Sequence, residues 1–141
     1  MAEIRFETGL KTFDINGACQ VTFAPTDMSF IERVYTCLEN MDAKQAKYKE
    51  VAEAATNAEV FDLARRMDSE AREEINAVFD FDICRPLFGT MNVFTVADGF
   101  PIWANFMLAI IDQFEGEFAE QKKKTNPRIR KYTEKYNKGH L

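Results

Sequence analysis

Histidine is almost absent from this chain of 141 residues, and the single one is His140. General-base or triad chemistry that depends on histidine therefore has no candidate in the body of the sequence. No glycine-rich phosphate loop is present, and no nucleophile has a partner base. These absences predict a protein that is not an enzyme and that has no cofactor or small-molecule substrate.

Cysteine is also scarce, since Cys19, Cys37 and Cys84 are odd in number and widely spaced. This pattern suits neither a disulfide framework nor a zinc site, so we expect small buried hydrophobic side chains. Asp80 and Asp82 could share a metal ion only if their segment were a strand, and two carboxylates are too few for a site. We therefore expect no bound metal.

Long apolar runs are missing too. No run approaches the ~20 residues that a membrane span needs, and no signal peptide opens the sequence. We therefore expect a cytosolic protein without membrane contact. Hydrophobic residues at 46% and charged residues at 29% are typical of a globular protein, and the length suits one domain with its own core.

The net charge of −5 is unevenly distributed. Residues 122–141 hold eight Lys or Arg against one Glu, a net of +7, so residues 1–121 hold ten basic and 22 acidic side chains, a net of −12. We divide the chain into a single α-rich domain at 1–121, with a β hairpin in 1–25, and a basic C-terminal tail at 122–141. Such a tail can bind an acidic neighbour or fold back on its own body.

The tail also has a helical signal, because Asn126-Pro127 can start a short helix that ends near Asn137. Its cations alternate with Tyr132 and Tyr136, a pattern that could follow a nucleic-acid backbone. The acidic body would repel phosphates, which argues against nucleic acid as a partner. The cations that we consider for binding are Lys122, Lys123, Lys124, Arg128, Arg130 and Lys131.

An amphipathic helix is predicted from Thr26 or Asp27 to Ala55, although a capping box at Ser29 and Glu32 leaves its start open. Only Lys44 breaks its apolar face. The residues of that face are Phe30, Val34, Cys37, Met41, Tyr48, Val51 and Ala55.

Thr56 and Glu59 form another capping box, which predicts a turn and then a second helix that Pro86 ends near Cys84. Its apolar face is Val60, Ala64, Met67, Ala71, Ile75 and Val78. Its outer face, Arg65, Arg66, Asp68, Glu70, Arg72 and Glu73, is expected to be solvated. A single unbroken helix is the alternative, and we favour the hairpin because one helix would far exceed the usual length. Each face is half a core, so a partner helix is expected to pack on it, either from the same chain or from another copy in a homo-oligomer.

A small antiparallel sheet, either a hairpin or a meander, is predicted within residues 3–23. Ile4 and Phe6 alternate with charges, and Asn16-Gly17 is a strong hairpin signal. A three-residue loop, 15–17, would pair Phe13 with Cys19 and place Phe13, Cys19, Val21 and Phe23 on one face. A two-residue turn would pair Phe13 with Gln20, and burial favours the longer loop.

Residues 79–101 form an irregular and very apolar connection. These side chains either fill the end of the helical hairpin or form an adhesive surface, and the first interpretation is favoured because most large apolar side chains are buried. The candidate partner-binding residues are Leu87, Phe88, Phe94, Phe100 and Trp103.

Pro101 suits the first turn of a third helix, the most hydrophobic of the three and the expected centre of the fold. Its apolar face is Trp103, Phe106, Met107, Ile110, Ile111, Phe114 and Phe118. Together the patterns predict a mainly α (α+β) fold. It has a small N-terminal β hairpin or meander, a long helical hairpin, a third hydrophobic helix and a short basic C-terminal helix or tail.

Several short stretches between residues 13 and 116 resemble, in order and spacing, the small tail assembly chaperone-like proteins of long-tailed bacteriophages (siphophages). They are Phe13-Asp14-Ile15-Asn16-Gly17, Phe23-Ala24-Pro25-Thr26-Asp27, Phe30-Ile31-Glu32-Arg33, Ile75-Asn76-Ala77-Val78-Phe79-Asp80, Leu87-Phe88-Gly89 and Asn105-Phe106.

The resemblance implies a non-enzymatic viral protein of the host cytoplasm that holds the tape-measure protein during tail assembly. It offers no catalytic residues to carry over. The chain departs from that family in a strand at residues 3–8 and in its basic tail. A second hypothesis is an inhibitor or regulator whose acidic body binds a basic host protein, such as a nucleic-acid enzyme.

Overall fold

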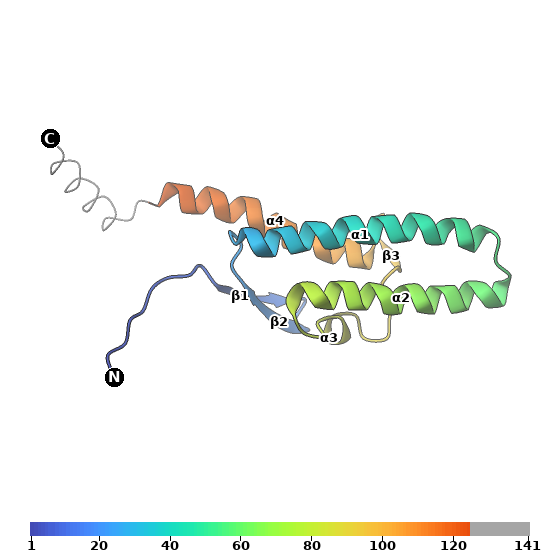
Figure 1. Ribbon diagram of the computed structural model, residues 1–141, viewed down its shortest axis with the longest axis horizontal. Coiled ribbons are helices and arrows are strands. Elements are labelled where there is room, and N and C mark those ends of the chain that lie inside the picture. Colours follow the sequence, from blue (N-terminus) through green and yellow to red (C-terminus); the bar gives the residue numbers. More distant parts are fainter. Residues whose placement is uncertain (125–141) are drawn as a thin grey trace.

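The computed structural model describes residues 1–124, and this part of the chain is mainly helical with a small antiparallel hairpin, as the sequence predicts (Figure 1). The elements are β1 (Lys11–Ile15), β2 (Cys19–Phe23), α1 (Met28–Glu53), α2 (Asn57–Phe79), α3 (Cys84–Phe88), β3 (Val96–Ala97), β4 (Phe100–Pro101) and α4 (Ile102–Lys123). None of the helices in the described residues is long and apolar enough to cross a membrane.

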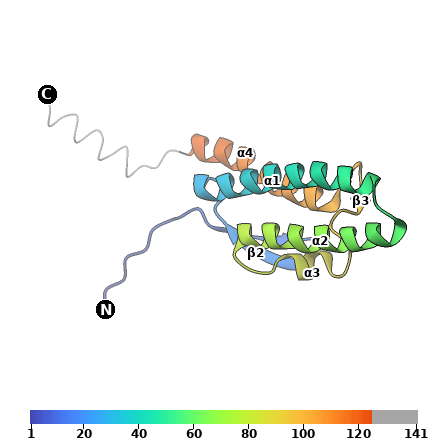
Figure 2. The same ribbon diagram turned by 45° about the vertical axis from the view of Figure 1, so that its right-hand side comes forward.

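The two long helices are separate and run antiparallel, so the predicted hairpin is confirmed (Figures 1 and 2). Thr56 and Glu59 form the predicted capping box at the start of α2. α1 begins at Met28, after the predicted start at Thr26 or Asp27 and before the alternative capping box at Ser29. Asp27 is its N-cap and accepts a hydrogen bond of 2.9 Å from the Ser29 N–H.

The predicted end of the second helix is wrong. α2 ends at Phe79, because Asp80 adopts a left-handed conformation (φ 63°) that stops the helix. Pro86 instead lies in the first turn of the short helix α3, where helical N–H groups have no intrahelical partner and its missing donor is tolerated. The Arg85 N–H in that turn donates to the Asp82 carboxylate.

The β hairpin has the predicted three-residue loop length, but the loop is shifted by one residue to 16–18. Phe13 therefore pairs with Val21 rather than with Cys19, and Ile15 pairs with Cys19. Asn16 and Gly17 both have positive φ, which lets the Ala18 N–H donate to the Ile15 carbonyl at 2.9 Å. Both registers place the same side chains on the inner face, so the buried face is as predicted.

The predicted strand at residues 3–8 is absent. Residues 1–9, the N-terminal arm, lead away from the body in both views (Figures 1 and 2). Ile4 and Phe6 are 90% and 81% exposed. The period-two pattern at these residues therefore does not form a strand in the structure.

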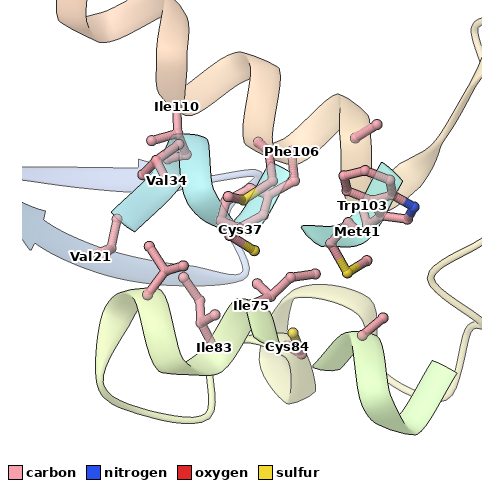
Figure 3. Close-up of a cluster of buried hydrophobic side chains, with 14 of the residues drawn as sticks. Val21, Val34, Cys37, Met41, Ile75, Ile83, Cys84, Trp103, Phe106 and Ile110 are labelled. Carbon is pink, nitrogen blue, oxygen red and sulfur yellow. The ribbon is translucent and has the colours of Figure 1, made fainter. Parts of the chain in front are cut away.

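The core lies where α1 contacts both α2 and α4, and the hairpin closes one side of it (Figure 3). α4 supplies more buried residues than any other helix, as expected for the most hydrophobic one. A line of aromatic contacts joins the layers: Phe23 stacks on Phe30 with ring centroids 4.5 Å apart, and Phe30 meets Phe114 edge-on at 5.9 Å.

The predicted helix faces are buried only near the core. The buried residues of this face on α1 are Phe30, Val34, Cys37 and Met41. Val51, nearer the end of α1, is exposed. The buried residues of α2 are Leu63, Ala71, Ile75 and Val78, and the expected Val60 is exposed.

One row of side chains on α2 corrects the prediction of a solvated outer face. Asp68, Arg72 and Asn76, spaced four residues apart, form what we call the α2 polar row. Arg72 pairs with Asp68 (Nε–Oδ2 3.0 Å) and donates to the carbonyl oxygens of Gly89 and Met91, each at 2.8 Å.

The other two members of the α2 polar row also hold the following segment. Asp68 accepts from the Val93 N–H at 2.8 Å, and Asn76 accepts from the Cys84 N–H at 3.0 Å. Residues 84–93 are thus fixed along α2 by half-buried polar side chains.

Replacing Arg72 should destabilise the fold much more than replacing an exposed arginine on the same helix. Arg72→Ala removes the cation that pairs with the half-buried Asp68 carboxylate and the side-chain donor to two carbonyl oxygens, and should lower the free energy of unfolding by about 2–3 kcal/mol. Arg65→Ala is the matched control, because its pair with Asp62 is exposed, and should change stability by at most about 0.5 kcal/mol. Urea unfolding of both variants measures the difference, and equal effects would contradict this role of Arg72.

Two of the three thiols are buried, as predicted, and Cys19 is half-buried. Burial raises the pKa of Cys37 to about 11 and of Cys84 to about 12, from an ordinary value of 9.0. Both thiols therefore stay protonated at neutral pH, and none of the three forms a disulfide.

At pH 8 a maleimide should label Cys19 alone in the folded protein and all three cysteines after unfolding, as counted by mass spectrometry. Above pH 9 the unfolded thiols lose protons before the folded ones, so stability should fall as the pH rises from 9 towards 11. Cys84→Ala should reduce this alkaline loss. Rapid native labelling of Cys37 or Cys84 would show that the core is open there.

Candidate functional site

An apolar groove lies where the end of β1, the helix α3 and the first turns of α4 meet, and we call it the α3–α4 groove. Its volume is about 440 Å³. It is lined by Ile15, Asn16, Leu87, Phe88, Met91, Ile102, Asn105, Phe106 and Ala109.

The floor of the groove is rigid. Phe88 meets Phe106 edge-on, with ring centroids 6.1 Å apart, and Phe106 in turn packs against Phe79 at 5.6 Å. Phe106 is buried, whereas Leu87 and Phe88 are half-buried and present part of their surface to the groove. The floor therefore belongs to the core and cannot close without repacking it.

The rim combines one adaptable side chain with polar groups. Met91 is 53% exposed, and its backbone carbonyl is held by Arg72. Asn105 donates from Nδ2 to the Ala97 carbonyl at 2.8 Å, which fixes its side chain beside the groove. A flexible thioether above a fixed aromatic floor suits apolar side chains of varied shape.

The five candidate partner-binding residues do not lie together. Leu87 and Phe88 line the α3–α4 groove, whereas Phe100 and Trp103 line a second cleft of about 350 Å³ beside α1. Phe94 is half-buried and meets Trp103 edge-on at 6.5 Å. Trp103 is 1% exposed and is therefore part of the core. Its Nε1–H has no hydrogen-bond partner in the described residues.

The sequence reasoning missed most residues of the groove, among them Ile15, Asn16, Ile102 and Ala109. They come from three separate segments, and no local pattern shows that the hairpin loop reaches the start of α4. The sequence marks Met91 only as one of the apolar residues of the connection 79–101. The four-residue spacing of Asp68, Arg72 and Asn76 shows that they share one row on a helix, and it gives no sign of the segment that they hold.

Of the basic tail, Lys122 and Lys123 form the last turn of α4 and Lys124 is its C-cap residue, where cations suit the negative helix end. Arg128, Arg130 and Lys131 lie outside the described residues.

The chemistry that the groove offers is apolar contact. Within residues 1–124 no group of three His, Cys, Asp or Glu side chains is placed to hold a metal ion. Asp82, considered as a ligand, instead accepts a hydrogen bond of 3.0 Å from the Asn76 amide.

Comparison with known proteins gives no match: no protein-family model, no curated protein and no solved structure is similar to this chain.

Proposed function

We propose that this protein is a non-enzymatic tail assembly chaperone of a long-tailed bacteriophage, which holds the tape-measure protein in the host cytoplasm during tail assembly. The observation that carries the proposal is the α3–α4 groove, an apolar surface with a rigid aromatic floor and an adaptable methionine on its rim. An amphipathic helix of the client would insert its apolar side chains there, and release needs no chemistry.

The stretches that resemble the chaperone family support this assignment, because three of them meet at the groove. Ile15 and Asn16 come from the first stretch, Leu87 and Phe88 from a later one, and the last pair is Asn105-Phe106. The resemblance rests on segments about 90 residues apart in sequence, and the fold brings them to one apolar surface.

Co-expression with the tape-measure protein of the same phage genome tests the proposal. The intact chain should keep the client in the soluble fraction and co-purify with it, also at high salt, because apolar contact is weakly screened. Met91→Asp adds a charge to the rim, and Ala109→Trp fills the groove from an exposed position. Each variant should lower the retained client by about tenfold, a loss that corresponds to one buried apolar side chain.

Val96→Asp is the matched control, because Val96 is 69% exposed and does not line the groove. It should hold the client as well as the unchanged chain does. Circular dichroism should show the same helical signal for all variants. The proposal would be refuted if the two groove variants retained as much client as the intact chain does, or if the intact chain retained none.

The second candidate, a regulator that binds a basic host protein, is favoured by one observation on α4. From Ile102 to Gln121 this helix has no Lys or Arg, and Asp112, Glu115 and Glu120 are exposed. Binding through this surface would weaken steeply with salt and with Glu115→Gln, while Met91→Asp would leave it unchanged.

A further inference from the structure

The outer edge of β2 is open and borders a cleft. Among the residues that the structure describes, no backbone group of β2 hydrogen-bonds to anything except β1, because the sheet has two strands only. A cleft of about 630 Å³, here called the β2 cleft, lies between β2 and the end of α2. Its lining includes Leu10, Val21 and Phe23, together with Arg33 from α1 and with Asp80 and Phe81, which follow the end of α2.

The N-terminal arm has the sequence of a missing strand. Ile4 and Phe6 alternate with Glu3, Arg5 and Glu7, so an extended arm has one apolar and one charged face. The six residues of 3–8 would span roughly 20 Å as a strand, close to the length of the five-residue β2. An exposed strand of this kind and an open sheet edge are complementary surfaces.

We propose that the N-terminal arm of a second copy occupies the β2 cleft and adds a third strand to the edge of β2. Ile4 and Phe6 would then pack on the end of α2, where Phe81 is 45% exposed. The charged face of the arm would meet Arg33 and Asp80 at the mouth of the cleft, which supply both signs of charge. Arg33 is already held over the Phe30 ring, 5.6 Å from its centroid.

A second copy fits this position better than the arm of the same chain. On its own chain the arm continues directly into β1 and leads away from the body, so it does not lie along β2 (Figures 1 and 2). Leu10 itself lines the cleft, so each arm starts beside the cleft of its own copy. Two copies can therefore exchange arms reciprocally, which gives a closed dimer.

Light scattering behind a sizing column tests the exchange on the full chain. The unchanged protein should have twice the mass of one chain. Phe6→Asp should weaken the dimer by about a hundredfold or more, because each of two arms loses a buried aromatic side chain. Phe81→Asp should act from the receiving side, and Val96→Asp, outside the cleft, should leave the dimer intact.

A monomeric unchanged protein would overturn the proposal, as would a dimer that survives Phe6→Asp. Circular dichroism checks that the fold is kept, which is expected because Phe6 is exposed.

Mixed disulfide formation identifies the occupant. In a Cys19→Ser background, chains with Ile4→Cys are mixed under oxidising conditions with chains that have Phe81→Cys. A disulfide that joins position 4 of one chain to position 81 of the other supports the exchange, since the two thiols are on different molecules. A chain that carries both Ile4→Cys and Phe81→Cys is the second sample. If its disulfide forms only within one chain, each arm occupies its own cleft, and the proposal is overturned. This test is independent of the chaperone function.

Discussion

The ion pair between Arg72 and Asp68 is the interaction on which the position of residues 84–93 depends. Arg72 donates hydrogen bonds to two carbonyl oxygens of this segment, and Asp68 accepts one from the Val93 N–H. Residues 80–95 have little regular structure of their own, and their backbone groups need partners. The α2 polar row supplies these partners at Cys84, Gly89, Met91 and Val93. A segment rich in aromatic residues is thereby held in one conformation, with part of its surface outside the core.

The groove follows from this arrangement. If hydrophobic burial alone determined the position of residues 80–95, the segment would turn Leu87, Phe88 and Met91 inward as far as sterics allowed. Arg72 holds the Met91 carbonyl at 2.8 Å, and the Met91 side chain is 53% exposed above a floor that belongs to the core. An accessible apolar surface can persist in this way on a stable protein.

Local signals in the sequence were sufficient for the elements whose structure depends on near neighbours. The capping box at Thr56 determines the turn between the long helices, and the Asn16-Gly17 pair determines the hairpin. The conformation of residues 80–95 could not be predicted, because it depends on contacts with side chains of the preceding helix, such as Arg72 with Gly89, 17 positions apart, and Val93 with Asp68, 25 positions apart. The same limit applies to the groove, whose walls come from three separate segments. The alternation at Ile4 and Phe6 is a different case, because residues 3–8 form no strand and both side chains are exposed.

The tip of the helical hairpin, where the turn joins α1 to α2, has fewer buried residues than the rest of the two helices. Beyond Met41 no residue of α1 is buried, and on the first two turns of α2 only Leu63 is. Helix α4 does not extend along this part, so the two helices rely on each other and on the cross-links from Lys44 to Glu74 and from Tyr48 to Glu70. Local opening of this tip exposes little apolar surface, and its free energy is therefore well below that of global unfolding. Amide hydrogens near Ala54 and Thr56 should exchange by fraying of the tip, while those around Ile75 and Met107 exchange only when the whole domain unfolds.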